Sequence, residues 1–361
     1  MDLEVDRQQL STVRLVEAPP AQLQPGQARL RVHRFALTSN NITYAVFGDM
    51  MNYWDFFPAN PAADETVWGR VPVWGFGDVV ESTVGELAEG MRVYGYLPMS
   101  DELVIEPGRF DDRGFSDVSA HRAPMAATYN RYVFCDGDPA YDAVHEPHQM
   151  VLWPLFFTSF MIDDVLDDSA LLAGSVVVSS ASSKTAIGAA YLLSQREGVH
   201  VVGLTSARNA EFVRELGCYH QVVTYDSLGE LPEGPAAYVD IAGDSAVTRA
   251  VHEHFHDQLT YSMIVGGTHW NGPAPEPGDL PGPAPQFFFA PAQIAKRSKD
   301  WGRDGLELRT IGAWTSYREW VDGWLHFEQA VGGNAVKATY LELLSGRIDP
   351  RVGQVCAMVA E

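Results

Sequence analysis

The segment VVVSSASSKTAIGAA, residues 176–190, has residue types and a spacing that suit phosphate binding. Valines precede a run of serines, and Lys184 and Thr185 precede small residues, so the segment predicts a buried strand, a polar loop and a helix. The first N–H groups of a helix are unpaired and lie at the positive end of the peptide dipoles, which favours anions. We therefore expect Ser182, Ser183, Lys184 and Thr185 to hold a phosphate group.

Three interpretations of this loop stay open. A triphosphate-binding loop has the pattern G-x-x-x-x-G-K-[ST], but its glycine positions here hold Val178 and Ser183, and a β-branched valine does not readily adopt glycine-only geometry. A dinucleotide-binding turn in which serines replace glycines fits better, with Gly188 kept where helix and strand pack closely. The third interpretation is a structural turn without a ligand.

The next predicted strand, residues 200–206, ends in polar side chains. An NAD-binding chain places an acidic side chain at this point to bind the ribose hydroxyls, whereas this chain has Thr205, Ser206 and Arg208. A guanidinium and a hydroxyl are suitable donors to a 2′-phosphate. The pattern favours NADP(H), and the alternative is a solvated arginine at the start of a helix.

Composition narrows the class of protein. The chain has 361 residues, 46% of them hydrophobic, which allows a sizeable core and about two domains. Its net charge of −22, with only four lysines, argues against a nucleic-acid partner. The three cysteines are too widely separated for a disulfide framework or a zinc knuckle. Apolar runs stop short of roughly 20 residues and no signal peptide is recognisable, so we expect no membrane span and a cytoplasmic protein.

The order of the predicted elements indicates an α/β fold. Short β-rich runs separated by turns fill residues 1 to about 130, which predicts a mainly β domain. From residue 151 strands alternate with helices, which predicts a doubly wound parallel sheet. The strands of that sheet are expected at 175–180, 200–206, 220–226, 236–243 and 260–267. A proline- and glycine-rich loop is expected at 271–285, and helical stretches are expected around 294–301 and 320–331.

Several segments resemble the medium-chain dehydrogenase/reductase superfamily, and within it the zinc-free, quinone-oxidoreductase-like branch. Residues 28–49 resemble the first strand and asparagine-bearing loop of its GroES-like domain. Residues 152–166 resemble the helix that leads into its nucleotide-binding domain, and residues 198–226 resemble the second and third strands of that domain. Residues 346–355 resemble the segment that returns to the GroES-like domain.

The resemblance implies a domain organisation. It implies a GroES-like β-rich substrate domain over residues 1–150, a Rossmann-type NADP(H)-binding domain over 151–320, and a return segment over 321–361 that packs on the first domain. Residues 40–59 and 287–297 further indicate a poorly characterised family within the superfamily.

The resemblance also implies NADP(H) as the cofactor and adds candidate residues. Tyr225 falls where a tyrosine often lies beside the adenosine phosphate. Thr158 precedes the nucleotide-binding domain, and other candidates follow the strands, because ligands lie outside the carboxyl edges of doubly wound sheets. The full set expected to bind the cofactor is Ser182, Ser183, Lys184, Thr185, Thr205, Ser206, Arg208, Tyr225, Gly243, Gly266, Thr268 and Thr158.

The catalytic group is expected in the β-rich domain. Zinc alcohol dehydrogenases of the superfamily use cysteine and histidine ligands, but this chain has Thr-Ser-Asn-Asn at residues 38–41, where a cysteine ligand would be expected. Hydride transfer without zinc needs placed hydrogen-bond donors to stabilise a developing enolate or alkoxide. Tyr44, Asn41 and Tyr53 are the candidates, and packing in the core or at its rim is the alternative.

A competing motif is HEHFH, residues 252–256, which satisfies the H-E-x-x-H pattern of zinc proteases. Val247, Val251 and Phe255 form an apolar stripe on the predicted helix, so we expect His252 and His256 to project from the opposite side into water. The segment also fits a crossover helix of the sheet, which makes a metalloprotease the weaker hypothesis.

These inferences predict an NADP(H)-dependent, zinc-independent oxidoreductase that transfers hydride to an activated C=C or C=O bond of a quinone, enone or enal. Aromatic side chains occur in two runs, at residues 53, 54, 56 and 57 and at residues 287–289. They suggest an apolar, planar substrate, with core packing as the alternative. The alternative function is a non-catalytic dinucleotide-binding sensor or partner-binding protein on the same fold. A homodimer is expected from the resemblance alone.

Overall fold

The computed structural model describes residues 1–17, 22–59, 66–265 and 280–360. The chain folds into two compact units: unit 1 comprises Met1–Pro154 and Leu325–Glu361, and unit 2 comprises Leu155–Trp324. Each unit has its own sheet structure and its own buried hydrophobic cluster. The predicted α/β fold class, a β-rich part together with a parallel sheet, is confirmed.

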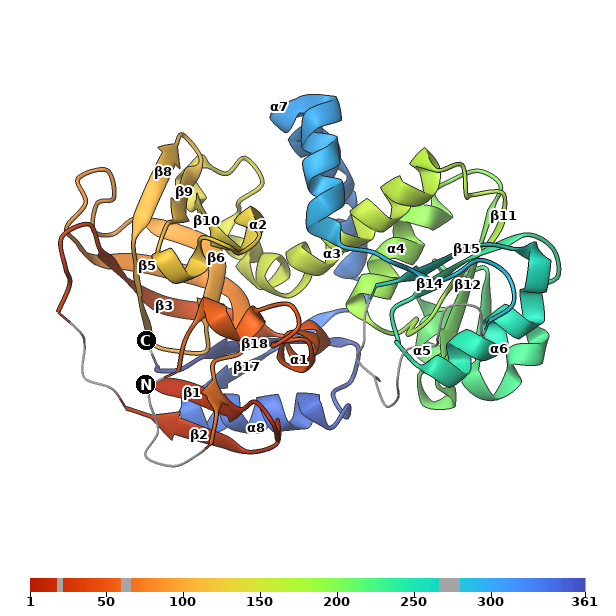
Figure 1. Cartoon of the computed structure of the whole chain (residues 1–361), viewed down its shortest axis with the longest axis horizontal. Helices are drawn as coiled ribbons and strands as arrows, with labels where there is room; N and C mark the ends of the chain where they lie inside the picture. Colours follow the sequence, from red (N-terminus) through yellow and green to blue (C-terminus); the bar gives the residue numbers. More distant parts are fainter. Residues whose placement is uncertain (18–21, 60–65, 266–279, 361) are drawn as a thin grey trace. The chain divides into compact units, whose positions relative to one another are not determined.

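Unit 2 is built around a six-stranded parallel sheet (Figure 1). Its strands in chain order are β11 (Gly174–Val178), β12 (Val199–Thr205), β13 (Gln221–Thr224), β14 (Ala236–Asp240), β15 (Leu259–Ile264) and β16 (Gln286–Phe287). Within the sheet the order is β13-β12-β11-β14-β15-β16, so it reverses direction at the centre, between β11 and β14. This is the doubly wound arrangement of dinucleotide-binding domains, and ligands of such sheets bind where the order reverses.

Helices cover both faces of this sheet. They are α4 (Lys184–Ser194), α5 (Ala210–Glu215), α6 (Ser245–Phe255) and α7 (Ala290–Val321), the 3₁₀ turns η5 (Ala207–Asn209), η6 (Tyr225–Glu230) and η7 (His256–Gln258), and the greater part of α3 (Glu146–Asp168). Side chains alternate across a strand. Val176 and Val178 therefore pack with α3, α4 and α5 on one face, whereas Val177 packs with α6 on the other. Burial on both faces explains the continuous valine run of β11.

A buried arginine attaches α7 to α3. Arg297 donates from Nε to Asp164 Oδ2 at 2.6 Å, and its Nη2 lies 2.9 Å from Asp168 Oδ1. Within α7 the backbone leaves helical geometry at Gly302, where φ is 73°, a conformation that glycine adopts without steric cost. The element is therefore two helical pieces that meet at this glycine.

Unit 1 is mainly β, as the sequence predicts (Figure 1). Its strands are β1 (Asp2–Asp6), β2 (Val13–Val16), β3 (Ala28–Leu37), β4 (Trp68–Gly69), β5 (Pro72–Ser82), β6 (Arg92–Pro98), β7 (Glu102–Ile105), β8 (Pro107–Asp111), β9 (Gly114–Asp117), β10 (Arg131–Phe134), β17 (His326–Val331) and β18 (Val352–Ala357). One sheet has the order β2-β1-β4. The larger one has the order β17-β18-β3-β5-β6-β10-β9-β8, with β7 also paired to β3.

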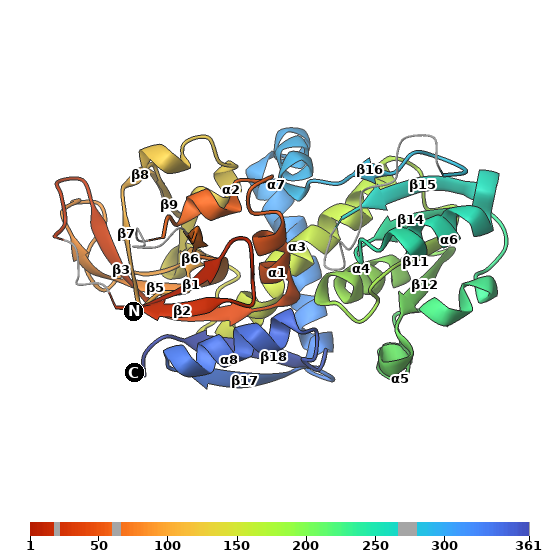
Figure 2. The same ribbon diagram turned by 60° about the horizontal axis from the view of Figure 1, so that its bottom comes forward.

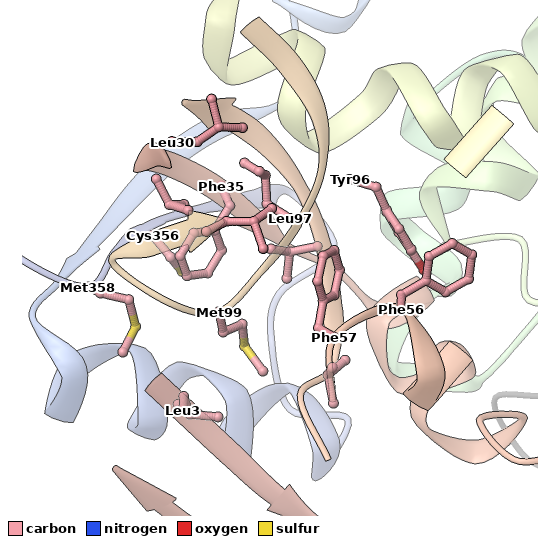
Figure 3. Close-up of a cluster of buried hydrophobic side chains, with 14 of the residues drawn as sticks. Leu3, Leu30, Phe35, Phe56, Phe57, Tyr96, Leu97, Met99, Cys356 and Met358 are labelled. Atoms are coloured by element: carbon pink, nitrogen blue, oxygen red, sulfur yellow. The ribbon is translucent and has the colours of Figure 1, made fainter. Parts of the chain in front are cut away.

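Short helical elements complete unit 1. They are α1 (Ser39–Val46), η1 (Tyr53–Phe56), η2 (Ala120–Arg122), α2 (Ala127–Asn130), η3 (Cys135–Gly137), η4 (Ala143–His145), α8 (Gly333–Leu344) and the first turns of α3. Figure 3 shows part of the core, in which Phe35 of β3, Leu97 of β6 and Cys356 of β18 pack together without exposed surface or nearly so. The last two strands and α8 thus share one core with the N-terminal part of the chain.

The predicted helix over residues 320–331 is wrong beyond its start. α7 ends at Val321, and His326–Val331 forms β17, which pairs in parallel with β18. Figure 2 shows α8 running alongside these two strands. β17 is an edge strand with mostly exposed side chains, so it lacks the apolar alternation of a half-buried strand, and pairing with β18 decides its structure.

One helical segment, Ala143–Asp168, is long and apolar enough to cross a membrane by length and composition. Its most apolar stretch is 61% buried inside the fold, where Ile162 and Leu166 have no exposed surface. The core helix of a folded protein, when it is mostly buried, meets the same length and composition test.

α4 lies directly against α3 at Gly188. A Cβ atom on Gly188 would lie 2.7 Å from Ser159 Oγ, and the Ser159 hydroxyl itself donates to the Thr185 carbonyl at 2.7 Å. The expectation that Gly188 permits close packing of helix on strand is wrong about the partner, which is a second helix. The small residue lets the first turns of α4 approach α3 closely enough for this hydrogen bond.

Gly188→Ala is expected to lower the free energy of unfolding by about 1–3 kcal/mol, because the added methyl group overpacks the α3–α4 contact. The matched control is Gly312→Ala on α7, where a Cβ atom would meet open space. That change is expected to raise the free energy of unfolding by roughly 0.5–1 kcal/mol, the helix-propensity difference. Urea unfolding measures both values, and a stabilising effect of Gly188→Ala would contradict the close contact.

Candidate functional site

At the carboxyl edge of the parallel sheet, the Ser179 side chain joins two loops. The hydroxyl follows β11, donates to Asp240 Oδ1 at 2.8 Å, and accepts from the backbone N–H groups of Ile241 and Ala242 at 2.9 Å each. Ser179 is fully buried. The loops after β11 and β14, the two strands where the sheet order reverses, are thereby joined through one oxygen atom.

Asp240, the last residue of β14, completes this connection. Its Oδ1 also accepts from the Gly243 N–H at 3.0 Å, and its Oδ2 accepts from the Thr248 hydroxyl at 2.8 Å. The carboxylate is buried, so these donors replace the water that a buried charge would otherwise lose. Gly243, one of the predicted cofactor residues, has a φ of 68° and lies in the turn that this carboxylate holds.

The predicted phosphate loop begins with a serine in a backbone conformation that favours glycine. Ser180 has a φ of 52°, in the left-handed region that favours glycine. Its N–H donates to the Tyr225 hydroxyl at 2.9 Å, and the N–H of Ala181 donates to the Leu204 carbonyl at 2.9 Å. Burial raises the pKa of Tyr225 to about 12, so its hydroxyl keeps its own proton at neutral pH. Tyr225 therefore lies at the loop and is bonded to Ser180, the residue with the left-handed backbone conformation.

The serine hydroxyls at the start of α4 act as acceptors. Ser182 Oγ accepts from Asn209 Nδ2 at 2.9 Å, and Ser183, the N-cap, accepts from the Ala186 N–H at 3.3 Å. A hydroxyl that accepts in this way retains its proton for donation to an anion. Lys184, half-buried, is the first residue of α4, and Thr185 is the second.

The segment after β12 reaches the same loop. Thr205, the last residue of β12, is buried, Ser206 is half-buried and caps η5, and Arg208 is exposed. The Asn209 amide at the end of η5 forms the bond to Ser182. The structure therefore places three predicted parts of the site, at 182–185, 205–208 and 225, within one hydrogen-bonded group of loops.

Other predicted cofactor residues lie elsewhere. Thr158 is half-buried on α3, beside Ser159, whose hydroxyl reaches the first turn of α4. Gly266 and Thr268 lie outside the described residues. Sequence reasoning missed Asn209, Ser179 and Asp240. In the structure, Ser179 follows β11 and Asp240 ends β14, at the edge where ligands of parallel sheets bind, whereas the predicted strands ran on to residues 180 and 243.

In unit 1 the candidate tyrosines form part of a larger aromatic group. We call Tyr44, Tyr53, Trp74, Tyr96 and Tyr129 the tyrosine cluster. Ring centroids are 4.6 Å apart for Tyr44 and Tyr53, 5.0 Å for Trp74 and Tyr96, and 4.9 Å for Tyr96 and Tyr129. The residues come from α1, η1, β5, β6 and α2, and Trp74 stands opposite Tyr96 in the register of β5 and β6.

Hydrogen bonds in the tyrosine cluster are few and long. Trp74 Nε1 donates to the Tyr44 hydroxyl at 3.2 Å, and the hydroxyls of Tyr53 and Tyr129 are 3.3 Å apart. Burial raises the pKa of Tyr44, and the neighbouring Tyr53 raises it further. Burial also raises the pKa values of Tyr53, Tyr96 and Tyr129, so the cluster is a set of protonated hydroxyl donors at neutral pH.

Asn41, the third catalytic candidate, is held by bonds within the fold. Its Oδ1 accepts from the Thr38 N–H at 2.7 Å in a capping box at the start of α1, and its Nδ2 donates to the Pro72 carbonyl at 2.8 Å. The amide joins α1 to β5. This geometry favours a structural role for Asn41 and leaves Tyr44 and Tyr53 as the catalytic candidates.

The aromatic run beside Tyr53 belongs largely to the core. Trp54, Phe56 and Phe57 are buried at 1–2% exposure, and Figure 3 shows Phe56 next to Tyr96 of β6. Phe287, in contrast, is 59% exposed on β16. Sequence reasoning missed Trp74, Tyr96 and Tyr129 as members of the tyrosine cluster. The two tyrosines at 94 and 96, spaced to face one side of a strand, were the signal for part of it.

The H-E-x-x-H motif is not a metal site in this fold. The expectation that His252 faces water is wrong: it is fully buried, with Nδ1 2.8 Å from the Pro281 carbonyl and Nε2 2.9 Å from Ser262 Oγ. Burial lowers the pKa of His252, which favours the neutral ring. α6 ends at Phe255, so His256 lies beyond the helix and does not share a helical face with His252. Within the described ranges no group of three or more His, Cys, Asp or Glu side chains could hold a metal ion.

Residues 35–349, most of the chain, match the family described as "Protein of unknown function (DUF2855)". The chain belongs to the DUF2855 family. Membership of a poorly characterised family, expected from residues 40–59 and 287–297, is confirmed. No curated protein matches this DUF2855 chain in sequence.

Solved structures resemble this DUF2855 protein over nearly its whole length. CurA from Vibrio vulnificus, in complex with NADPH, is 14% identical with a TM-score of 0.61 over 97% of this chain and 94% of CurA. The yhdH oxidoreductase from Salmonella enterica, in complex with NADP, is 15% identical with a TM-score of 0.54 over 98% of each chain. The quinone oxidoreductase from Coxiella burnetii is 14% identical with a TM-score of 0.51 over 98% of each chain. The DUF2855 chain has the fold of medium-chain dehydrogenases/reductases, as its sequence resemblance predicts.

Ser179→Ala in this DUF2855 protein is expected to lower the free energy of unfolding by about 2–4 kcal/mol, because two N–H groups beside a buried carboxylate lose their acceptor. Ser182→Ala is the matched control. It removes only the bond from Asn209 and is expected to cost about 1 kcal/mol or less. Denaturant unfolding of the two variants gives both values, and equal losses would contradict the assigned role of Ser179.

Proposed function

We propose that this DUF2855 protein is an NADP(H)-dependent reductase that transfers hydride to an activated C=C or C=O bond. The observation that carries the proposal is the hydrogen-bonded meeting of the serine loop, Asn209 and Tyr225 at the reversal point of a doubly wound sheet. Ligands of such sheets bind at this place. The presence of NADPH in CurA and of NADP in the yhdH oxidoreductase, which share the fold, supports the choice of cofactor.

The donors at the loop suit a pyrophosphate. The hydroxyls of Ser182 and Ser183 keep their protons for an anion, and the ammonium group of Lys184 begins an eleven-residue helix whose N-terminal dipole favours negative charge. Thr185 adds a hydroxyl on the same turn. In this proposal these four residues hold the pyrophosphate, and Thr205, Ser206 and Arg208 hold the 2′-phosphate. NADPH, when bound, supplies the hydride.

In the proposed reaction, the tyrosine cluster provides the hydrogen-bond donors to the substrate. Tyr44 accepts from the indole N–H of Trp74, which can only donate, so the proton of Tyr44 points elsewhere. Tyr44 and Tyr53 are proposed to donate hydrogen bonds to a substrate oxygen as negative charge develops on it. We propose zinc-independent chemistry because residues 38–41 provide hydroxyls and amides where zinc enzymes of this fold have a cysteine ligand.

A non-catalytic sensor of NADP(H) is the second candidate. The Ser180 N–H donates to the Tyr225 hydroxyl, and the Ser183 N–H donates to the Ser180 carbonyl. These two backbone N–H groups are therefore already paired within the chain. NADPH titration by fluorescence, followed by turnover on a panel of small enones, enals and quinones, separates the two. Binding with turnover supports the reductase, binding without turnover favours the sensor, and no heat and no rise in melting temperature at saturating NADPH would contradict both.

Arg208→Ala is expected to weaken NADPH binding about tenfold or more and to leave NADH binding unchanged, because only NADPH carries the 2′-phosphate. Arg214→Ala is the matched control, an exposed arginine on the adjacent helix α5. It is expected to change neither affinity. Isothermal calorimetry with both cofactors measures the effect, and an equal loss for NADPH and NADH would contradict the assignment of Arg208.

Lys184→Ala is expected to weaken NADPH and NADH by a similar factor, about tenfold, because both cofactors carry the pyrophosphate. Lys299→Ala removes an exposed lysine of α7 and serves as the control for the loss of one positive charge. If the Lys184 variant binds both cofactors as the wild-type protein does, the lysine has a structural role only.

A further inference from the structure

We propose that the tyrosine cluster of unit 1 is a binding site for the oxygen of a planar phenol, bound as its phenolate, with the Tyr96 hydroxyl as the donor that the oxygen engages. The inference depends on unit 1 alone. It shares Tyr44 and Tyr53 with the catalytic part of the proposed function, but its test uses no cofactor, so its outcome does not depend on NADP(H) binding by unit 2.

The first observation is an orphaned hydroxyl. Tyr96 has no exposed surface, and within the described part of the chain its oxygen has no partner at hydrogen-bonding geometry, although the Tyr44 hydroxyl lies nearby. A buried donor without an acceptor costs stability. An acceptor supplied from outside the chain would remove that cost at Tyr96.

The second observation is a local surplus of donors. Four hydroxyls and the Trp74 indole lie together. The bond between the Tyr53 and Tyr129 hydroxyls, at 3.3 Å, is long beside the usual 2.7–2.8 Å of O–H···O bonds, and the Trp74 N–H bond to Tyr44 is 3.2 Å. The Tyr44 hydroxyl also lies near Asn40, Tyr96 and Tyr129. Burial raises the pKa of Tyr44, Tyr53, Tyr96 and Tyr129, so the hydroxyls stay protonated. An anionic oxygen can accept two or three such bonds, and donors that are already ordered stabilise it more than water does.

The third observation is the shape and polarity of the surroundings. Tyr96 lies between aromatic neighbours, with ring centroids 5.0 Å away for Trp74, 4.9 Å for Tyr129 and 5.2 Å for Phe56. These rings pack edge to face or offset against one another, so the surroundings of the Tyr96 hydroxyl are aromatic, and an aromatic ligand matches them in polarity. Trp74 and Tyr129 are the partly exposed members, so the ligand is expected to enter on their side.

A buried arginine holds the backbone of two members of the tyrosine cluster. Arg122 donates from Nη2 to the Tyr129 carbonyl at 2.8 Å and from Nη1 to Asp117 and to the Tyr132 hydroxyl, which in turn donates to the Tyr96 carbonyl at 2.7 Å. The main chains of Tyr96 and Tyr129 are thus held by one bonded group. The Arg122 guanidinium lies 5.3 Å from the centre of the Phe56 ring, and its charge is balanced by the buried Asp117 carboxylate.

The test is equilibrium dialysis of the full-length protein, without cofactor, against para-nitrophenol at a pH where the ligand is ionised. We expect saturable binding, and binding of para-nitroanisole, which has the same ring but no ionisable oxygen, weaker by about tenfold or more. Tyr96→Phe is expected to weaken para-nitrophenolate by about 10- to 100-fold while leaving para-nitroanisole within about twofold.

Tyr94→Phe is the matched control. Tyr94 lies on the same strand, stacks on Trp74 at 5.7 Å, and donates its hydroxyl to the Gln149 carbonyl, away from the cluster. It is expected to leave the affinity for the phenolate within about twofold. The melting temperature of Tyr96→Phe is expected to equal or exceed that of the wild type, because no bond within the chain is lost. No binding to the wild type, or equal binding by the folded Tyr96→Phe variant, would overturn the proposal.

Discussion

The arrangement of the loops that follow β11 and β14 in unit 2 depends on one hydrogen-bonded oxygen, the Ser179 hydroxyl. At the reversal point of a parallel sheet, two strand ends leave in opposite directions and their backbone N–H groups must be paired. Ser179 pairs two of them and donates to Asp240, which in turn holds Gly243 and Thr248. The carboxylate is buried, so removal of any donor leaves a charge short of partners. The loops that follow β11 and β14 are therefore positioned by polar contacts that the apolar core alone could not specify.

The serine loop combines a backbone conformation that favours glycine with polar side chains. Ser180 occupies a left-handed conformation that glycine adopts more easily, and Tyr225 accepts its N–H. In the proposed function, anion binding at this loop depends on hydroxyls and on the ammonium group of Lys184. The chain has a net charge of −22 and only four lysines, so Lys184 provides one of the few ammonium groups in this protein.

Unit 1 places polar groups inside an aromatic core, where their protons are difficult to remove. Burial keeps every member hydroxyl of the tyrosine cluster in its donor form. The register of β5 on β6 sets Trp74 opposite Tyr96, and the Arg122 group holds the backbone of Tyr129. A donor-rich, low-dielectric setting stabilises negative charge on an oxygen more than water does. The same physical property underlies the proposed reductase chemistry and the proposed phenolate site.

The resemblance to known dehydrogenases added Tyr225 to the candidate site. The sequence by itself determined the α/β fold and the alternation of strands and helices in unit 2, and it indicated the serine loop and the β12 end as one candidate site. These follow from local patterns: apolar runs of strand length, small residues at a helix start, and hydroxyls after strands. Tertiary structure decided that Gly188 faces α3, that His252 is buried, and that 326–331 pairs as a strand. It also decided that Asn41 caps a helix and that Tyr96 lacks a partner. Those outcomes depend on residues distant in the chain, whose contacts leave no periodic signal in the segment itself.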